Sequence, residues 1–290
     1  LVPGGGGVIT NLETGQSVGH IDVAFPILHG PFGEDGTIQG LLKFADVPFV
    51  GAGVLGSAVG MDKDVMKRLL RDAGIPIGKF LTVQEDMAPS FEEVTIRFGV
   101  PVFVKPANMG SSVGVSKVRD KEGFEHAVRE AFEYDSKILI EEYIQGREIE
   151  CAVLDGAPPI ASLPGEVIPS HEFYSYEAKY LDEHGARTVT SANLSVDTIA
   201  RVQELAIQAF QALCCEGFAR VDFFVTETNE ILVNEINTIP GFTPISMYPK
   251  MMEVSGISCT EVIDRLILLG IKRFEREQEL KTIYAHPKLS

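Results

Sequence analysis

The sequence lacks the cysteine patterns and the long apolar runs that mark several classes of protein. Its four cysteines, Cys151, Cys214, Cys215 and Cys259, form neither a disulfide framework nor the paired spacing of a zinc site. This favours a protein of a reducing compartment. Apolar runs such as residues 263–271 are interrupted by charged residues and fall short of the roughly 20 residues that a bilayer requires. We therefore expect no membrane span and no membrane partner.

Basic residues are also scarce. The 25 Lys and Arg residues are outnumbered by 41 Asp and Glu residues, which gives a net charge of −16, and such a charge repels polyanions. We therefore expect no nucleic-acid partner. The 290 residues, of which 45% are hydrophobic and 23% charged, fit two or three compact globular units, because domains usually span about 100 to 200 residues.

Apolar periodicity indicates an α/β unit followed by two α+β units. The predicted strands are residues 20–28, 47–50, 100–106, 114–118, 137–142, 148–154, 219–225 and 230–236. The predicted helices are residues 38–45, 61–73, 124–132, 197–213 and 260–274.

Two short segments with alternating polar residues form the strongest candidate site. Arg220 and Asp222 are two residues apart in one predicted strand, and Glu235 and Asn237 are two apart in or beside another. Residues two apart in a strand share a face. Two carboxylates and an amide oxygen on one face, among apolar neighbours, suit Mg²⁺ that carries phosphates. An antiparallel hairpin with one solvated face and a surface Arg–Glu pair would show the same alternation.

The register of these two strands depends on the turn between them. If residues 227–228 form a two-residue turn, Asp222 lies opposite Val233 and Arg220 lies opposite Glu235. All four polar side chains then project from one face. The TIPGF run that follows the second strand predicts a tight turn with backbone N–H groups beside the proposed metal, which favours the site over an ordinary hairpin.

A lysine at the end of a strand precedes a loop of glycines and serines. Lys105 lies in the run FVKP, and residues 107–114 (ANMGSSVG) follow. An ammonium group and several backbone donors in this order can hold a phosphate chain. The loop is not a Walker A sequence, and a flexible hairpin connection is the alternative. Lys63, on the predicted helix after Met61, is a second candidate phosphate contact, although most helical lysines are solvated.

Three further segments fit a nucleotide-dependent enzyme. The third strand of the second unit ends at Glu141 and Glu142, and a chain crossing there offers backbone groups to an adenine edge, with Glu148 accepting ribose hydroxyls. A charged edge strand is the alternative. The long loop from about residue 164 to about residue 195 is typical of an active-site lid, although its tyrosines also fit ordinary packing. His29 is the only histidine at the C-terminal end of a predicted strand, where open α/β sheets bind ligands.

Taken together, these segments resemble the ATP-grasp enzymes and, in detail, the D-alanine–D-alanine ligase family. The resemblance covers residues 21–269, nearly the whole chain. It rests on HGPFGEDG (29–36), MDK (61–63), VKPANMGSSVG (104–114), GRE (146–148), YSYEAKY (174–180), RVD (220–222) and NEINTIPGFT (234–243). It implies an ATP-grasp fold in which a truncated N-terminal α/β domain, residues 1–57, precedes two α+β domains, residues 58–144 and 145–290, that clasp ATP.

The resemblance also implies a role for each candidate residue. The residues that would bind ATP are Lys63, Lys105, Glu141, Glu142, Tyr143, Ile144, Glu148 and Lys179. Those that would bind two Mg²⁺ ions, for which Mn²⁺ can substitute, are Asp222, Glu235 and Asn237. Arg220 and the Gly241 N–H would stabilise the transferring and tetrahedral centres, and Ser111 and Tyr180 would close the loop pair over the site. The substrate contacts would be His29, Tyr174, Ser246 and Met247.

The implied activity is a two-step ligation of D-alanine that consumes ATP. The carboxylate of one D-alanine attacks the γ-phosphate to give an acyl phosphate, and the amine of a second D-alanine displaces phosphate. Such an enzyme supplies D-Ala-D-Ala for peptidoglycan in cell wall synthesis, is cytoplasmic and is usually a homodimer. In the family, tyrosine at the position of Tyr180 goes with an amine acceptor and phenylalanine with D-lactate. The alternatives are a ligase with D-lactate or D-serine as acceptor and a catalytically incomplete nucleotide-binding fragment.

One part of the family pattern has no match in the sequence. The family's first strand and its S-x-E-H-x-V-S run, whose glutamate orients the first D-alanine, are not found before His20. We therefore expect the chain to be a truncated copy of a longer protein. If Leu1 were the natural start, the site for the first D-alanine would be incomplete. The intact mass of the natural product tests this, because a mass near 31.6 kDa would contradict the truncation.

Overall fold

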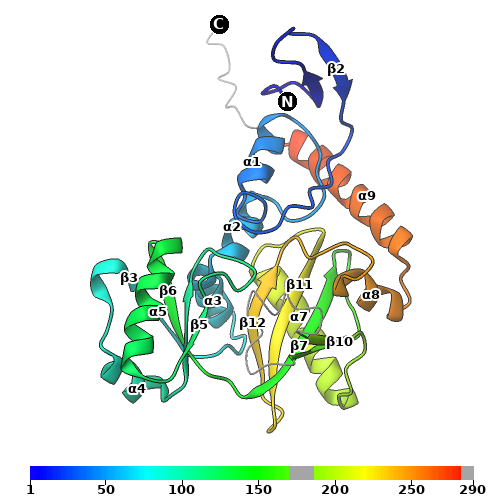
Figure 1. The fold of residues 1–290 in the computed structure, drawn as a ribbon. Coiled ribbons are helices and arrows are strands. Elements are labelled where there is room, and N and C mark those ends of the chain that lie inside the picture. The colour runs from blue at the N-terminus through cyan, green and yellow to red at the C-terminus, as the bar shows by residue number, and fades with distance from the viewer. Residues whose placement is uncertain (170–185, 282–290) are drawn as a thin grey trace, which may run out of the picture.

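The computed structural model describes residues 1–169 and 186–281. This part of the chain is a mixed α/β structure with a two-stranded, a four-stranded and a six-stranded sheet. The two larger sheets lie side by side, and the N-terminal elements lie above them (Figure 1). Those N-terminal elements are β1 (Val8–Thr10), β2 (Ser17–His20), α1 (Thr37–Phe44) and α2 (Val54–Met61). Within the described residues, no helix combines the length and the apolar character that a bilayer span needs.

The N-terminal region contains less strand than its apolar runs predict. Residues 20–28 and 47–50 meet only at an isolated parallel bridge between Ala24 and Phe49. Each segment contains a proline, which has no N–H group to extend a ladder. The two predicted strands are therefore wrong, whereas the predicted helix at residues 38–45 is confirmed as α1.

α3 (Lys63–Asp72) lies between the two larger sheets (Figure 1). The helix predicted over residues 61–73 is divided at Asp62, whose carboxylate accepts hydrogen bonds from two N–H groups of the first turn and so caps α3. Met66 and Leu70 enter the hydrophobic core of the six-stranded sheet. Lys67, on an adjacent face of the helix, contacts the four-stranded sheet. α3 therefore contributes apolar side chains to one sheet and charged side chains to the other.

The four-stranded sheet has the strand order β3-β6-β4-β5. Its strands are β3 (Phe80–Gln84), β4 (Val102–Pro106), β5 (Ser116–Val118) and β6 (Lys137–Glu142). The accompanying helices are η1 (Glu85–Met87), α4 (Phe91–Phe98) and α5 (Lys121–Tyr134). On one face, Val104 and Ile140 pack against Val94 of α4 and Phe124 of α5. The other face is left for the polar side chains described below. β4, β5, β6 and α5 were predicted from the sequence, and β3 and α4 were not.

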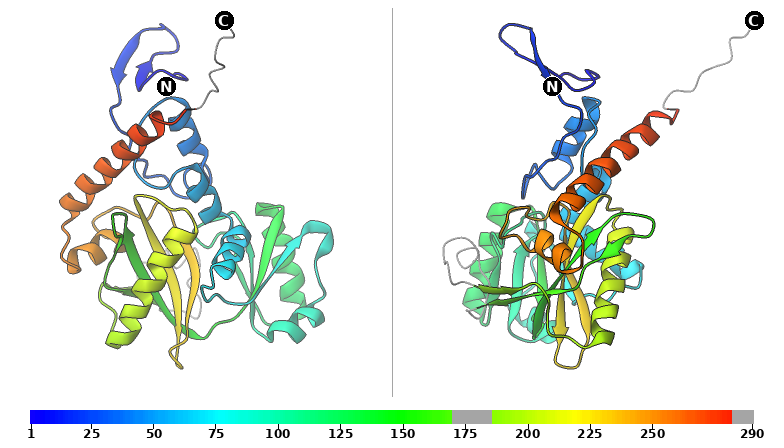
Figure 2. Two further views of the ribbon diagram at one scale, coloured as in Figure 1. Left: turned by 180° about the vertical axis from the view of Figure 1, so that it is seen from behind. Right: turned by 90° about the vertical axis from the view of Figure 1, so that its right-hand side faces the viewer.

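The six-stranded sheet has the order β10-β9-β7-β11-β12, with β8 paired to β7. Its strands are β7 (Gly146–Leu154), β8 (Ile160–Ala161), β9 (Gly165–Pro169), β10 (Ala186–Val189), β11 (Phe218–Thr226) and β12 (Ile231–Asn237). α7 (Val196–Ala212) covers one face, as the left view of Figure 2 shows. There Phe210 and Val202 pack with Val221 and Phe223 of β11. The predicted strands and helix of this region are confirmed, apart from shifts of one or two residues at their ends. The prediction of one long loop over residues 164–195 is wrong at both ends, which form β9 and β10.

Two helices join this sheet to the N-terminal region. α8 (Met247–Val254) packs its Tyr248 with Phe218 of β11, and α9 (Cys259–Gln278) follows. Arg273 of α9 donates hydrogen bonds to the backbone oxygens of Phe49 and Gly51. The right view of Figure 2 shows α9 extending from the sheets to the N-terminal elements.

The chain passes from β6 of one sheet directly to β7 of the other. The predicted boundary between residues 144 and 145 lies in this crossing, and that between residues 57 and 58 lies inside α2. The domain limits 1–57, 58–144 and 145–290 stay a prediction.

Candidate active site

One face of the six-stranded sheet carries charged and polar side chains from three neighbouring strands. This acidic face consists of Glu148 and Glu150 of β7, Arg220 and Asp222 of β11, and Glu235 and Asn237 of β12. Asp222 pairs with Glu150 on one side and with Glu235 on the other, and Arg220 pairs with Asn237. Residues paired directly across antiparallel strands share a face. The prediction that Arg220, Asp222, Glu235 and Asn237 share one face is confirmed.

The register that led to this prediction was nevertheless wrong. Asp222 lies opposite Glu235 instead of Val233, and Arg220 lies opposite Asn237 instead of Glu235. Two irregularities explain the difference. The turn is one residue longer than predicted, since Thr226 N–H bonds to Glu230 O, and a bulge at residue 234 adds a second residue. Each one-residue shift moves side chains to the other face, so the two shifts cancel.

The Arg220 guanidinium is fixed by two acids of the acidic face. Its Nε and Nη2 atoms each lie 2.7 Å from an oxygen of Asp222, a two-point geometry, and its Nε lies 3.3 Å from Glu150 Oε1. Burial alone would lower the pKa of Arg220, but Asp222 and Glu150 raise it well above its usual value. Asn237 donates from Nδ2 to Asp222 Oδ2 over 2.9 Å. Among the described residues of this face, one guanidinium thus lies among four carboxylates.

The polar face of the four-stranded sheet carries the opposite charge. This lysine cluster consists of Lys63 and Lys67 of α3, Lys105 of β4, and Glu141 of β6. Glu141 Oε2 lies 2.7 Å from Lys105 Nζ, and its Oε1 lies 3.2 Å from Lys67 Nζ. Burial alone would raise the pKa of Glu141, but the ammonium groups of Lys105 and Lys67 lower it below its usual value. Two buried ammonium groups, those of Lys105 and Lys67, therefore share the Glu141 carboxylate, and the buried Lys63 belongs to the same cluster.

Lys63 lies where the lysine cluster meets the acidic face. Burial lowers its pKa, and Glu235 is the acid that opposes this shift most. Its Nζ donates to Met109 O over 2.6 Å, and its N–H bonds to Ala107 O. The loop at residues 107–114 is thus attached to the start of α3, close to both charged surfaces. Within that loop, Ser111 has a positive φ of 55°, an uncommon conformation for serine.

The crossing between the two sheets is held by charge and ring contacts. Glu142 accepts a hydrogen bond from Lys79 N–H over 2.7 Å, and its Oε2 lies 3.2 Å from Lys79 Nζ. The ring of Tyr143 lies 6.2 Å from that of Phe103, and Lys117 Nζ lies 4.2 Å from the Tyr143 ring centre. The segment predicted to hold adenosine is therefore anchored at the junction of the two sheets.

The turn after β12 is tied to the N-terminal region by Glu34, a residue to which the sequence assigned no role. Its carboxylate accepts hydrogen bonds from Gly30 N–H over 2.7 Å and from Ile239 N–H over 3.3 Å. Burial raises the pKa of Glu34, although the hydrogen bond from Gly30 N–H opposes this shift. His29 itself is exposed on the same loop. The Gly-rich motif could have indicated such a link, because it places a carboxylate among backbone donors.

The remaining predicted residues lie around this turn or outside the described chain. Ser246 precedes α8, and its Oγ accepts a hydrogen bond from Thr243 N–H. A Cβ atom on Gly241 would lie 2.8 Å from that Oγ, so the two residues are close neighbours. Met247 is buried with α8 in a hydrophobic cluster. The predictions for Tyr174, Lys179 and Tyr180 fall outside the described residues.

Comparison with known proteins identifies the family of the chain. A model of the D-ala D-ala ligase C-terminus matches residues 69–268, and one of the D-ala D-ala ligase N-terminus matches residues 5–52. The chain belongs to the D-alanine–D-alanine ligase family. It is 52% identical, over 278 residues, to a D-alanine–D-alanine ligase of Oceanobacillus iheyensis, with 95% of this chain and 75% of the relative covered.

Solved structures of the D-alanine–D-alanine ligase family share the fold. The D-alanine-D-alanine ligase of Coxiella burnetii is 45% identical, with a TM-score of 0.82 and coverage of 91% of this chain and 72% of that chain. The VanG D-Ala:D-Ser ligase of Enterococcus faecalis is 40% identical, with a TM-score of 0.79 and coverage of 87% and 73%. The predicted ATP-grasp fold is confirmed.

The acidic face of this ligase-family chain fits divalent cations by its donor chemistry. Within residues 1–169 and 186–281, no three His, Cys, Asp or Glu side chains are gathered as a metal cluster. The predicted set differs from such a cluster because its third member is the amide of Asn237. Asp222, Glu235 and Asn237 supply the hard oxygen donors that Mg²⁺ prefers. Among the described residues, the carboxylates of this face outnumber its guanidinium, and carboxylates attract cations.

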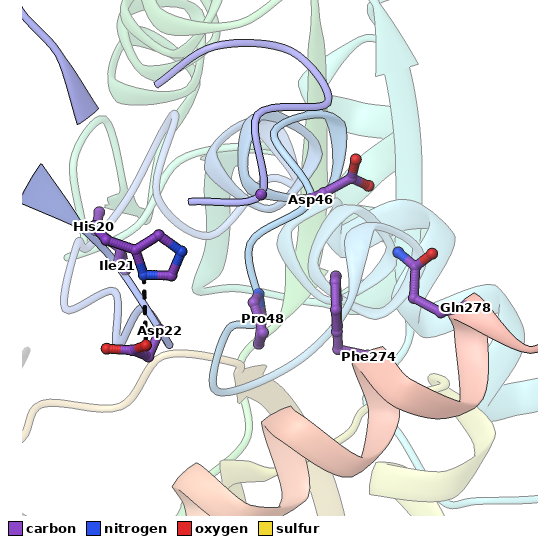
Figure 3. Close-up of a pocket in the computed structure, with 8 residues that line it drawn as sticks. His20, Ile21, Asp22, Asp46, Pro48, Phe274 and Gln278 are labelled. Atoms are coloured by element: carbon purple, nitrogen blue, oxygen red, sulfur yellow. Dashed lines mark ion pairs between the residues drawn. The ribbon is translucent and has the colours of Figure 1, made fainter. Parts of the chain in front are cut away.

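A cavity of about 400 Å³ lies away from this site. Figure 3 shows it between the end of β2, the loop with Asp46 and Pro48, and the end of α9. None of the described residues that line this cavity was predicted to belong to the active site. The ion pair between His20 Nδ1 and Asp22 Oδ1, 3.4 Å long, is largely exposed, and exposed pairs contribute little. The charged faces at α3, and not this cavity, form the candidate active site.

Proposed function

We propose that this protein is an ATP-dependent ligase that joins two D-alanine molecules through a D-alanyl phosphate intermediate and supplies D-Ala-D-Ala for peptidoglycan synthesis. One observation carries the proposal: a buried lysine cluster meets an acidic face at α3, in a chain of the D-alanine–D-alanine ligase family. Phosphoryl transfer depends mainly on positioning and on neutralisation of phosphate charge. The lysine cluster would neutralise phosphate charge directly, and the acidic face would do so through the cations that it binds.

Lys63 and Lys105 are the proposed contacts of the ATP phosphates. Both are buried, with 8% and 7% of their surfaces exposed, and both lie beside the loop at residues 107–114. Burial reduces competition from water and strengthens a lysine–phosphate contact. The crossing at residues 142–144 and Glu148 of β7 are proposed to hold adenosine, with Glu141 beside them.

Asp222, Glu235 and Asn237 are the proposed ligands of two Mg²⁺ ions, for which Mn²⁺ can substitute. When bound, the ions neutralise phosphate charge and so assist transfer of the γ-phosphoryl group. Arg220 is already oriented by Asp222 and Glu150. We propose that its guanidinium stabilises the negative charge on the transferring group.

Two bond exchanges make up the proposed reaction. In the first, a carboxylate oxygen of D-alanine bonds to the γ-phosphorus while the bond to ADP breaks. In the second, the amine nitrogen of another D-alanine bonds to the acyl carbon, phosphate leaves with the electron pair of the C–O bond, and the nitrogen loses a proton. The Gly241 N–H is proposed to donate to the oxyanion formed in between. His29, Tyr174, Ser246 and Met247 are proposed to contact the substrates.

The acyl phosphate needs protection from water. Ser111 and Tyr180 are proposed to close over the site, with Lys179 as a third phosphate contact. Closure of this kind excludes water from a reactive intermediate. We also propose that the enzyme acts in the cytoplasm as a homodimer.

A phosphate-release assay tests the function. With ATP and Mg²⁺, we expect phosphate release that requires D-alanine, together with D-Ala-D-Ala detected by mass spectrometry. ATP binding without D-alanine-dependent release would instead support a nucleotide-binding fragment.

The acceptor is a separate question, because the VanG D-Ala:D-Ser ligase is also similar to this chain. We propose D-alanine as the acceptor, since Tyr180 matches the family's tyrosine. Equimolar D-alanine, D-serine and D-lactate should yield mainly D-Ala-D-Ala. A dominant D-Ala-D-Ser or D-Ala-D-lactate product would show that the acceptor is D-serine or D-lactate, and the proposed ligase chemistry would still hold.

A further inference from the structure

Lys67 is a buried ammonium group to which neither the sequence motifs nor the proposed reaction assigns a role. Only 2% of its side chain is exposed. Its Nζ lies 3.2 Å from Glu141 Oε1 and 5.6 Å from the centre of the Phe80 ring. Burial of an ammonium group is costly unless it is paired. Lys67 is therefore not an ordinary solvated lysine on a helix surface, and its buried position needs another explanation.

The charge of the cluster suggests that explanation. Glu141 already has a partner in Lys105, 2.7 Å away, and this pair alone would be neutral. Lys67 adds a second ammonium group to the same carboxylate, so the three groups carry a net charge of +1. Uncompensated positive charge in a buried place opposes folding, but it favours an anion that binds there.

The sheet geometry places this charge on the face that we propose to bind ATP. Lys105 pairs with Leu139, two residues before Glu141 on β6, so both side chains project from the same face of the sheet. Lys67 follows Lys63 by four residues on α3, which places both lysines on one side of that helix. Lys67 thus contacts Glu141 from the α3 side, while Lys105 contacts its other oxygen.

We infer that Lys67 is a positioning residue for ATP: it binds one oxygen of Glu141, so that Lys105 keeps a net positive charge for the phosphates. The inference rests on the proposed function, because it takes ATP as the ligand of Lys105. A purely structural Lys67 would affect folding and leave the affinity for ATP unchanged.

The test compares four proteins: wild type, Lys67→Met, Lys67→Arg and Arg71→Met. Lys67→Met keeps an unbranched side chain and removes the charge. Arg71→Met is the matched control, because Arg71 lies one turn further along α3, is exposed, and stacks over the same Phe80 ring at 6.0 Å. Calorimetry with ATP and Mg²⁺ gives Kd, thermal melts with and without ATP give the ligand-induced shift in Tm, and steady-state kinetics give KM for ATP and kcat.

We expect Lys67→Met to raise Kd and KM for ATP by about tenfold, which corresponds to one lost charge interaction of about 1.4 kcal/mol. We expect kcat to change much less and the ATP-induced shift in Tm to shrink. Lys67→Arg should restore most of the affinity, and Arg71→Met should bind ATP like the wild type. If Lys67→Met does not fold, Lys67→Gln takes its place.

Two results would overturn the inference, and they differ from each other. Unchanged ATP affinity in a folded neutral variant, whatever its Tm, would make Lys67 a structural residue and leave the ligase proposal intact. A wild-type protein that does not bind ATP would overturn the proposed function, and the inference about Lys67 with it.

Discussion

The two larger sheets use the same construction with opposite charge. Each has one face covered by helices, α4 and α5 in the four-stranded sheet and α7 in the six-stranded sheet, and each leaves polar side chains on the other face. In the first sheet, Lys105 shares Glu141 with a lysine of α3. In the second, as far as the structure describes it, the Arg220 guanidinium lies among four carboxylates.

This difference shows how a chain with a net charge of −16 can bind a polyanion. Positive charge is concentrated in the buried lysine cluster, where the dielectric constant is low and charges act strongly. The acidic face next to it would repel phosphates by itself, but its oxygen donors suit cations that accompany them. Changes that remove a charge from one surface should therefore have different effects from changes in the other.

The largest expected effect comes from the acidic face. Glu235→Gln should lower turnover by about two orders of magnitude or more, because a proposed metal ligand is lost, while the fold is retained. D-alanine-dependent phosphate release and Tm measure the two effects. Glu230→Gln is the control, since Glu230 is an exposed acid just before β12. Near-normal turnover of Glu235→Gln would remove Glu235 from the metal site.

A change in the lysine cluster should act mainly on ATP. Lys105→Met should raise KM for ATP by about 10- to 100-fold, because the proposed charge-assisted hydrogen bond to phosphate is lost. KM for D-alanine should change less. Steady-state kinetics with each substrate varied in turn measure this. If KM for D-alanine rose as much as that for ATP, the separation of roles between the two sheets would be wrong.

The two surfaces should also differ in their response to acid. Because Lys105 and Lys67 lower the pKa of Glu141 below 4.5, ionised Glu141 stabilises the fold above that pH, and this stabilisation is lost as the pH falls through the lowered pKa. In Lys67→Met, one of the two ammonium groups is absent, so the pKa of Glu141 is lowered less. The loss of stability should then be smaller and should be complete at a higher pH than in the wild type. Denaturant unfolding over a series of acidic pH values measures it. Identical pH profiles for the variant and wild type would contradict the assignment.

The smallest effect is expected on the helix-covered side of the six-stranded sheet. Arg147 forms a two-point contact with Glu166 and also donates to Asn193 O. It is partly exposed, so Arg147→Ala should lower the free energy of unfolding by about 1 kcal/mol or less. Turnover of the folded protein should stay close to that of the wild type. A large loss of turnover would mean that Arg147, on the helix-covered side of the sheet, also contributes to the reaction.

The sequence was sufficient for most elements and for the faces of the strands. Alternation of side chains is a local property with a period of two, so Arg220 and Asp222 had to share a face. It was insufficient near Asp62, because α2 was not predicted and the helix predicted from Met61 begins only after the cap at Asp62. It also failed near Ala24, because a strand needs a partner with N–H groups as well as apolar residues.

The register of β11 and β12 illustrates the limit for the site. The predicted two-residue turn and the absence of a bulge were both incorrect, and the polar residues share one face because the two errors cancel. Neither Asn229, with a positive φ of 61° in the turn, nor the extra residue at position 234 gives a distinctive pattern in one sequence. Bulges depend on the partner strand.

The sequence by itself determined which residues alternate along each strand, the family of the chain and the chemical types in the site, because these depend on residue order over short spans. Only the tertiary structure decided that Lys67 and Lys105 share Glu141, that Glu34 holds the turn at Ile239, and that the lysine cluster meets the acidic face at α3. These contacts join segments far apart in the chain. Their distances follow from how the sheets pack around α3, which no local pattern specifies.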